Sequence, residues 1–553
     1  MPIYGNYQGA VREVTPIYGN NDGVTKALGF IYGNKDGVVT PIYQLSHVNI
    51  PYWTYDVNKS TVTLKTYTGY AQAGIKDIVI NGTDYPNYGI VMGAVQSNKR
   101  FINNSYQYIN SFTSNDVYMQ NMYAMFNECR NITNINIPDE DMKYVQNMAY
   151  VFTNCTRLKY CPVCGPNVTN MAYAYHFCKN FIGSPSCGNN VINMSTAYSM
   201  CSNLTGNPVC GPNVTDMTVT YYNCQRLTGS PVCGDKVTSM DRTYRNCYRL
   251  TGTPACGDNV KKMMDAYYNC SNLTGSPACG PNVTNLSNAY YNCSNLTGSP
   301  ACGDKVISLS NAYAKCDKLT GSPVCGNMVI SLSHAYYYCS NLTGNPVCGD
   351  RVMTMEHAYC QCRNITGSPV CGQNVTNMKW AYDTCCNLTG NPVCGDRVLT
   401  MWYTYCNCYN LTGSPVCGPN VTTLGGAYCN CYNLTGSPVC SDEVSSLLST
   451  YYDCHNLTGS PVCGDQVDNM QQTYWNCYRL TGTPVCGPNV ETMYQTYYNC
   501  TNLHGDVYIY SNNVANASGA FFNCPIDKIY VHPNTTSWDA FVKAGYSSKM
   551  VAF

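Results

Sequence analysis

The sequence has little charge and few histidines. Only 11% of its 553 residues are charged, 31 lysines and arginines balance 31 aspartates and glutamates, and seven residues are histidine. A protein that binds nucleic acid uses a basic surface to displace the counterions of the phosphates. Because the chain has no surplus of basic residues, we expect no nucleic-acid partner.

Long apolar runs are also absent. No stretch approaches the roughly 18 consecutive apolar residues of a membrane-spanning helix, so we expect no membrane span. The first residues, Met1 to Asn6, show no basic start followed by an apolar segment, and so no secretory signal is expected. Both absences predict synthesis in the cytosol, where cysteines act as small buried apolar residues rather than as a disulfide framework.

The usual arrangements of catalytic residues are missing as well. No nucleophile has a histidine partner at a defined spacing, no pair of carboxylates stands out, and no glycine-rich phosphate loop follows a strand. Zinc needs four converging ligands, which the scattered histidines do not supply. The sequence therefore predicts no enzymatic activity, no catalytic residues, no metal site and no cofactor.

What the chain does contain is a strict internal repeat. Cysteine occupies every twenty-third position from Cys155 to Cys500, sixteen times in all, and we call this series the inner line. A second series, the outer line, runs at the same step through fifteen positions from Cys164 to Cys486. Such a period is typical of a solenoid, in which each repeat buries its apolar side against its neighbours. We call one such repeat a rung.

Within one rung, Leu273–Asn295, apolar residues recur at steps of three and four from Val283 to Cys293, as on one face of a helix. Proline or aspartate precedes this run and glycine follows it, which are typical helix start and stop residues. The remaining Ser-Pro-Ala-Cys-Gly segment has room for a short strand. The sequence thus predicts an α/β solenoid with one helix and one short strand per rung and atypical capping ends.

The two cysteine lines allow two interpretations. Neighbouring rungs place equivalent cysteines within disulfide reach, but an unbroken line of thiols is simpler, because a continuous line cannot pair throughout without straining the stack. Cys406 and Cys429 lie outside both lines and occupy the same position one rung apart. They are the pair expected to form a disulfide in an oxidising medium.

Residues 282–297, Asn-Val-Thr-Asn-Leu-Ser-Asn-Ala-Tyr-Tyr-Asn-Cys-Ser-Asn-Leu-Thr, resemble the BspA-like leucine-rich repeats of bacterial surface proteins. The resemblance extends over about residues 115–524, although the aliphatic strand residues of that family are replaced here by Gly-Ser-Pro-Val-Cys. It implies a right-handed, leucine-rich-repeat-like array at 115–503, between a strand-rich N-terminal cap at 45–114 and a C-terminal cap at 504–553.

The first 44 residues contain a different repeat. Ile-Tyr-Gly-Asn occurs three times at one fixed spacing, beginning at Ile3, Ile17 and Ile31. These units resemble terminal repeats of virion proteins from phages of Gram-positive bacteria, which implies that residues 1–44 anchor the chain in a virion or surface assembly. The alternative is a flexible or strand-swapped tail. The candidate anchor residues are Ile3, Tyr4, Ile17, Tyr18, Ile31 and Tyr32.

A binding site is sought among the residues that differ between rungs. Two adjacent positions change in almost every rung, and on the expected helix they would lie outside, one rung above another. Aromatic residues there would form an exposed patch suited to a cell-surface glycan or protein. The alternative is neutral variation on an unconstrained surface. The candidate ligand-binding residues are His357, Trp380, Trp402, Tyr403 and Trp475.

Two classes of function remain open. The first is a non-enzymatic adhesion or receptor-binding protein, such as a phage fibre, on a virion or an extracellular surface after cytoplasmic synthesis. The second is a purely structural rod or filament-forming protein without a host ligand. A third alternative is a regular Thr/Ser array that binds a polymeric surface. No heptad pattern demands a coiled coil, and a homo-oligomer formed through residues 1–44 stays an open alternative.

Overall fold

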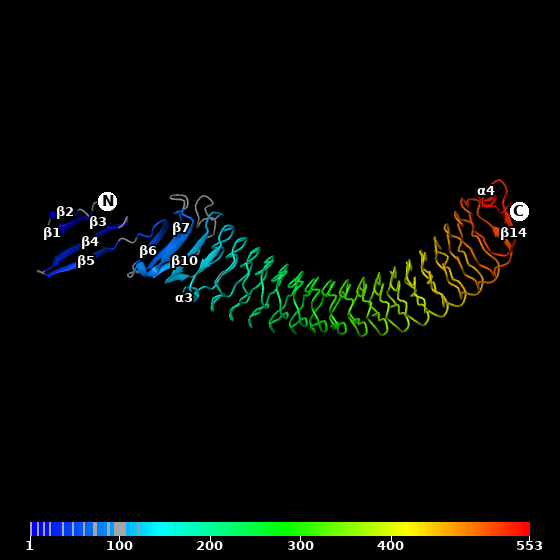
Figure 1. Cartoon of the computed structure of the whole chain (residues 1–553), viewed down its shortest axis with the longest axis horizontal. Helices are drawn as coiled ribbons and strands as arrows, with labels where there is room; N and C mark the ends of the chain where they lie inside the picture. The colour runs from blue at the N-terminus through cyan, green and yellow to red at the C-terminus, as the bar shows by residue number, and fades with distance from the viewer. Residues whose placement is uncertain are drawn as a thin grey trace.

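The computed structural model describes the backbone of the chain except residues 1–2, 8–9, 15–16, 22–23, 36–37, 47–48, 59–60, 70–74, 86–88, 93–106, 120 and 161. Of these described residues, it describes the side chains from residue 49 onward, other than those of 58, 89 and 91. Figure 1 shows the rungs side by side in one long, curved row. Strands β1–β5 lie beyond the N-terminal end of the row, and α4 with β14 lies at the opposite end.

The N-terminal repeats lie on antiparallel strands. Strand β1 (Ile3–Tyr7) pairs with β2 (Ala10–Val14), and β3 (Ile17–Asn21), β4 (Val24–Lys35) and β5 (Val38–Ser46) form a second sheet. The three Ile-Tyr-Gly-Asn units lie on β1, β3 and β4. The side chains of the six candidate anchor residues are outside the described part, so their role stays a prediction.

Two small sheets precede the first regular rungs. One has the order β11 (Val117–Met119), β9 (Gly89–Met92), β7 (Thr61–Tyr67), β6 (Trp53–Asn58). The other has the order β12 (Asn134–Asn136), β10 (Ser111–Asn115), β8 (Asp77–Asn81), with all pairs parallel. A 3-10 turn η1 (Gly82–Asp84) and a short helix α3 (Asp139–Met142) complete this region. Alternating burial along β7 turns Val62 and Leu64 inward.

The predicted helix in each rung is wrong. Within residues 143–504, all described except Cys161, the backbone has neither a helix nor a regular strand. The N–H of Leu286 donates to the carbonyl of Ser308, one rung further on, at 3.1 Å, whereas Ala289 N–H bonds back to Leu286 at 2.9 Å in a tight turn. The three-and-four spacing of apolar residues therefore comes from consecutive turns, with backbone bonds alternating between the same rung and the next.

The backbone conformation explains why no helix forms. Two non-glycine residues in nearly every regular rung have positive φ, for example Asn288 (55°) and Asn292 (58°). A helix of L-residues does not accommodate such values, and asparagine tolerates them better than most residues. The asparagines also bond to one another between rungs: Asn292 Nδ2 donates to Asn269 Oδ1 at 3.0 Å. The residues that the sequence analysis interpreted as the start and stop of a helix therefore belong to a series of turns.

The predicted strand is reduced to single bridges at another place. One residue per rung, two after the inward valine, makes an isolated parallel bridge to the next rung, as Asn285 does to Ser308. In the Ser-Pro-Ala-Cys-Gly segment, proline has no N–H to donate, which prevents a regular ladder there. A buried tyrosine satisfies that segment instead, because Tyr221 Oη donates to the Val209 carbonyl at 2.8 Å and accepts its N–H at 3.0 Å.

The core consists of columns of identical residues. Tyrosines from Tyr175 to Tyr497 stack with nearly parallel rings, with centroids 5.6 Å apart for Tyr198 and Tyr221. The inner-line cysteines lie beside them, and Cys201 Sγ donates to the Tyr175 carbonyl of the previous rung at 3.0 Å. The chain is thus a repeat array in which every regular rung adds one member to the aromatic column and one to the cysteine column.

Removing one tyrosine hydroxyl should weaken the array measurably. In Tyr221→Phe both backbone groups of Val209 lose their partner, and a buried group without a partner costs about 1–3 kcal/mol. We expect urea unfolding of the full chain to reveal a loss of that size. Tyr222→Phe, at a half-buried neighbour, is the control and should change the unfolding free energy little. Equal effects of both substitutions would contradict this role of the hydroxyl.

The C-terminal end differs from the rungs. Strands β13 (Gly505–Ile509), β14 (Ile526–Val531) and β15 (Met550–Ala552) form a parallel sheet. Helix α4 (Thr536–Lys543) begins at Thr535, whose side chain accepts the Trp538 N–H, and a 3-10 turn η3 (Ser547–Lys549) follows. This sheet and helix cover the last rung, as the atypical end of a repeat array must.

Candidate binding surface

The variable positions project from tight turns rather than from a helix. His357, Trp380 and Tyr403 have φ values of 52°, 57° and 53°. The N–H of each bonds to the next rung, as Trp380 N–H does to the Trp402 carbonyl at 2.9 Å. This pattern places the same position of successive rungs in one column.

Three of the predicted site residues come together in this column. The rings of His357 and Trp380 are 5.7 Å apart with planes 5° apart, and those of Trp380 and Tyr403 are 4.4 Å and 6° apart. His334, one rung earlier, stacks on His357 at 4.5 Å. We call these four residues the outer aromatic column. Sequence reasoning missed His334, although its place one rung before His357 could have identified it.

Trp402 and Trp475 lie elsewhere. Trp402 occupies the position next to the column and meets Tyr403 edge-on, at 5.6 Å and 62°. Trp475 lies two residues before an inner-line cysteine and stacks instead on Tyr498 at 4.2 Å. The site residues therefore form two separate groups, and all five are half-buried rather than fully exposed.

Stacking determines which part of each ring a ligand can meet. The faces of His357 and Trp380 are turned toward neighbouring rings on both sides. A ring edge carries partial positive charge, and the indole and phenol groups add hydrogen-bond donors. The column is therefore suited to ligands that offer oxygen acceptors, more than to sugars that stack on an open ring face.

The column is uncharged at neutral pH. Burial and the neighbouring His334 lower the pKa of His357 to about 4, and burial lowers the pKa of His334. Nδ1 of His357 is buried without a hydrogen-bond partner. Since both pKa values lie below the ordinary histidine value of about 6.5, both imidazoles are neutral at pH 7, and contacts made by the column should not depend on charge between pH 7 and 8.

A pair of glycines ends the column. A Cβ on Gly425 would lie 2.8 Å from Trp402, and one on Gly426 would lie 2.6 Å from Tyr403. Gly426 has φ +63°, but Ser449, at the same position one rung on, has φ 51° with a side chain. The backbone conformation alone therefore does not require glycine at this position. Glycine is required because the Tyr403 ring occupies the space that a side chain would need.

Gly426→Ala should destabilise the array by about 1–3 kcal/mol, the usual cost of forcing an extra methyl group into a packed site. Thermal unfolding of the full chain measures this loss. Ser449→Ala is the matched control and should be nearly neutral. Adding Tyr403→Ala to Gly426→Ala should recover much of the loss, because it removes the group that is struck. A loss unaffected by Tyr403→Ala would contradict the assigned contact.

A disulfide joins the two rungs at this end of the column. Cys406 and Cys429, the pair singled out in the sequence, are bonded with an S–S distance of 2.02 Å and a Cα–Cα distance of 4.6 Å. Each lies three residues after a column position, Tyr403 and Gly426 respectively. The disulfide therefore ties the rung that carries Trp402 and Tyr403 to the rung on which they rest.

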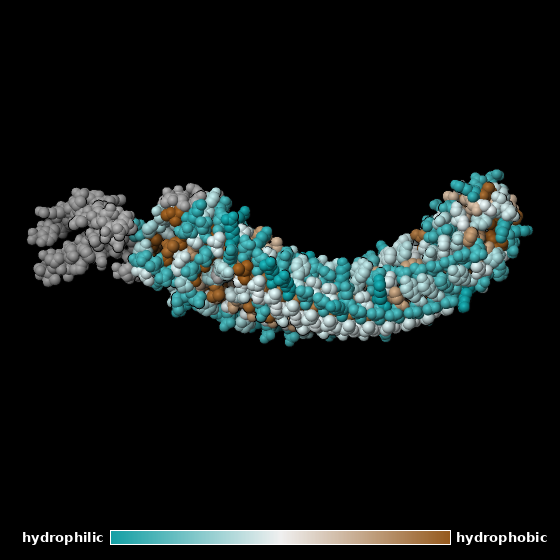
Figure 2. Space-filling model, viewed as in Figure 1, coloured by the Kyte–Doolittle hydropathy of each residue, from teal (hydrophilic) through white to brown (hydrophobic). Residues whose placement is uncertain are grey.

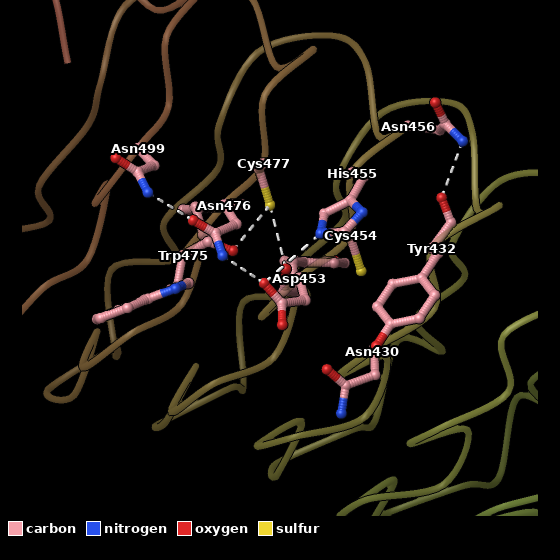
Figure 3. A network of polar contacts seen from close by, with 12 residues as sticks. Asn430, Tyr432, Asp453, Cys454, His455, Asn456, Trp475, Asn476, Cys477 and Asn499 are labelled. Atoms are coloured by element: carbon pink, nitrogen blue, oxygen red, sulfur yellow. Dashed lines mark hydrogen bonds and ion pairs between the residues drawn. The ribbon is translucent and has the colours of Figure 1, made fainter. Parts of the chain in front are cut away.

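A polar network lies beside Trp475. Figure 3 shows Asn499, Asn476 and Asp453 linked in a row between three rungs. Asn476 Nδ2 donates to Asp453 Oδ1 at 2.7 Å, and His455 Nε2 is 3.6 Å from the same oxygen. The network fixes the turns from which Trp475 projects.

The remaining surface was compared with the features of metal sites and membrane-spanning segments. Figure 2 shows that the visible face of the array is mostly hydrophilic to neutral, with scattered hydrophobic residues. In the described part of the chain no three metal-ligating side chains of the histidine, cysteine, aspartate or glutamate type converge. No helix among the described residues is long and apolar enough to cross a membrane.

Comparison with known proteins identifies the repeat. The model of the BspA type leucine rich repeat region matches residues 97–205, 121–251, 217–343 and 425–542, together more than half of the chain. A leucine-rich repeat protein from Bacteroides ovatus is 13% identical (92% of this chain and 99% of that chain covered, TM-score 0.26). A leucine rich cell surface protein from Faecalibacterium prausnitzii is 16% identical (82% and 93% covered, TM-score 0.25).

No curated protein matches the chain. The printed descriptions of both structures name bacterial repeat proteins, and neither concerns a virion. Both TM-scores are too low to support a conclusion about shape. The family model alone carries the assignment, and it agrees with the resemblance seen at residues 282–297: this protein belongs to the BspA-type leucine-rich repeat family.

Proposed function

We propose that this chain is a non-enzymatic adhesion protein that binds a cell-surface glycan or protein through the outer aromatic column and the adjacent Trp402. The observation that carries the proposal is the gathering of His334, His357, Trp380 and Tyr403 in neighbouring rungs at a position that otherwise varies freely. Half-buried aromatic residues are the usual anchors of binding surfaces. The BspA-type repeats of this chain, together with its likeness to a leucine rich cell surface protein of Faecalibacterium prausnitzii, support a surface location.

The proposal also includes the handedness of the solenoid and the segment through which the chain is attached. The rungs follow a right-handed solenoid, as the family implies, and residues 1–44 attach it to a virion or another surface assembly. The support for a virion is the resemblance of the Ile-Tyr-Gly-Asn units to terminal repeats of phage virion proteins. Deleting residues 1–44 should then abolish incorporation into the assembly while leaving cell binding intact.

Binding of the labelled full chain to a panel of bacterial cells, with glycans and cell-wall polymers as competitors, tests the proposal. The double variant Trp380→Ala/Trp402→Ala should reduce saturable binding at least about tenfold, as loss of an aromatic hot spot does. Tyr248→Ala, at an exposed tyrosine in a distant rung, is the control. Circular dichroism establishes that each variant is folded.

A specific observation favours a second function. The rings of the column cover one another, and Trp402 and Tyr403 rest on glycine, which is how packing residues behave. If the double variant unfolds, or if the unchanged chain binds no cell in a broad panel, the column serves stability. The chain would then be a structural rod.

A further inference from the structure

The outer line of cysteines has no part in the proposed binding surface. Its fifteen thiols lie at one position of successive rungs from Cys164 to Cys486, and the structure pairs none of them in a disulfide. All are half-buried except Cys486, which is buried. They are packed against the core from its edge, where solvent still reaches them.

The sulfur atoms of this line lie between rungs. Cys233 Sγ accepts the N–H of Gly257 at 3.2 Å, and Gly257 directly follows Cys256, the next cysteine of the line. The same contact joins Cys256 Sγ to Gly280 N–H at 3.2 Å. A Cβ on these glycines would lie 3.0–3.4 Å from the sulfur of the previous rung. Each sulfur thus reaches toward the next cysteine of the line, and the residue that follows that cysteine is glycine in every rung from Gly188 to Gly487 except at Ser441, so few side chains stand between neighbouring sulfurs.

The distance between equivalent positions suits a two-coordinate metal ion. The Cα atoms of Cys406 and Cys429, at equivalent positions of neighbouring rungs, are 4.6 Å apart. A zinc–thiolate bond is about 2.3 Å long, and two opposed bonds of about that length span about 4.6 Å, which is of the same order as this step between rungs. Thiolates select soft cations such as Cu(I). Zinc, which needs four converging ligands, is not served by a straight line of single thiols.

We propose that the outer line binds soft monovalent cations, Cu(I) or Ag(I), each held between the sulfur atoms of two neighbouring rungs. Each ion displaces one thiol proton, RSH + M⁺ → RS–M + H⁺, and no electron is transferred. A thiolate inside the line then bridges the ion below it and the ion above it. With one ion per thiolate the line stays neutral, which matters because an uncompensated charge is costly in a half-buried place.

The line is open at its N-terminal end. Cys164 and Cys187 both line a surface cavity of about 560 Å³ beside α3. Exposed Asp139 and Glu140 border the same cavity and attract cations to it. Burial raises the pKa of Cys187 to about 12. Protons therefore compete with the metal, and occupancy should fall as the pH is lowered.

Titration of the reduced full chain with Ag⁺ under nitrogen, with a small competing thiol present, tests the proposal. Native mass spectrometry counts the ions, and a pH-stat measures about one proton released per ion. Cys279→Ser interrupts the line and should remove about two ions, whereas Cys164→Ser, at its end, should remove about one, because these thiols have two neighbours and one neighbour in the line.

Two matched controls separate a line from independent thiols. Cys386 is half-buried, but Arg363 and Tyr409 occupy its position in the neighbouring rungs. Cys293, of the inner line, is fully buried and donates to the Tyr267 carbonyl. Cys386→Ser and Cys293→Ser should remove no ion.

Equal losses from Cys279→Ser and Cys386→Ser would overturn the proposal, as would ions bound without proton release. Thermal unfolding shows whether each variant is folded. If Cys279→Ser is not, Cys325→Ser at another interior position of the line distinguishes the outcomes, because the loss of about two ions from one substitution is expected only for a bridged line.

Discussion

Raising the pH from 7 to 10 is expected to unfold the reduced chain. Burial raises the pKa of Cys201 to about 12 and holds the pKa of Cys224 well above its ordinary value. An unfolded cysteine titrates near pH 8.5. Between these values the folded chain keeps a proton that the unfolded chain releases, so the stability from each buried thiol is fully present below about pH 8.5 and is lost as the pH rises.

The effect is large because the thiols are many. One pH unit above the unfolded pKa, each buried thiol costs about 1.4 kcal/mol of stability, and ten of them together cost about 14 kcal/mol, as much as the whole stability of a typical domain. The buried tyrosines act in the same direction at higher pH, since burial raises the pKa of Tyr244 well above its ordinary value.

Circular dichroism during a pH titration under nitrogen measures this transition, which should have its midpoint between about pH 9 and 10. Return to pH 7 should restore the signal, which distinguishes titration from chemical damage. A chain that keeps its structure at pH 11 would show that the inner-line thiols are hydrated rather than buried.

Deleting a whole rung should be tolerated, whereas deleting half a rung should not. Removal of residues 287–309 takes away one full period, so Ser310 takes the place of Ser287 and every column continues. The bond from Leu286 N–H to the Ser308 carbonyl is replaced by a bond to Ser331, which pairs in the same way with Leu309 in the intact chain. A shortened array keeps its nearest-neighbour contacts.

Removal of residues 287–298 is the control. It leaves a segment too short to complete a rung. The rungs before and after the deletion therefore cannot stack on each other, and their facing core residues are exposed to solvent. We expect one cooperative unfolding transition for the whole-rung deletion, with little loss of midpoint. The half-rung deletion should instead give separate transitions and cleavage by protease near the joint. Similar behaviour of both would contradict a strict period of one rung.

Particular residues show how far sequence reasoning reached into the fold. The two cysteine lines revealed the period and the inward positions, because a column buries the same residue in every rung. The prediction of a helix around Asn288 and Asn292 was wrong. The apolar residues beside them recur at steps of three and four, and this spacing occurs both in a helix and in a series of turns. Only φ values of 55° and 58° distinguish the two. A one-dimensional pattern contains no backbone dihedral.

The candidate site, too, could be predicted from the sequence only in part. The sequence alone selected His357, Trp380 and Tyr403 because their positions vary, but it did not separate the column that these three form from Trp402 and Trp475. Which ring meets which was decided in three dimensions, by the bonds between rungs that align equivalent positions and by Gly425 and Gly426, whose missing side chains admit Trp402 and Tyr403.

The sequence by itself therefore determined the repeat family, the length of the rung and the residues that face inward, since these depend on periodicity and on burial of apolar groups. The tertiary structure alone decided the course of the backbone within a rung, the contacts between columns and the exposure of each thiol. Those properties arise where equivalent residues of neighbouring rungs meet, and pairs so distant in the chain leave no local signal.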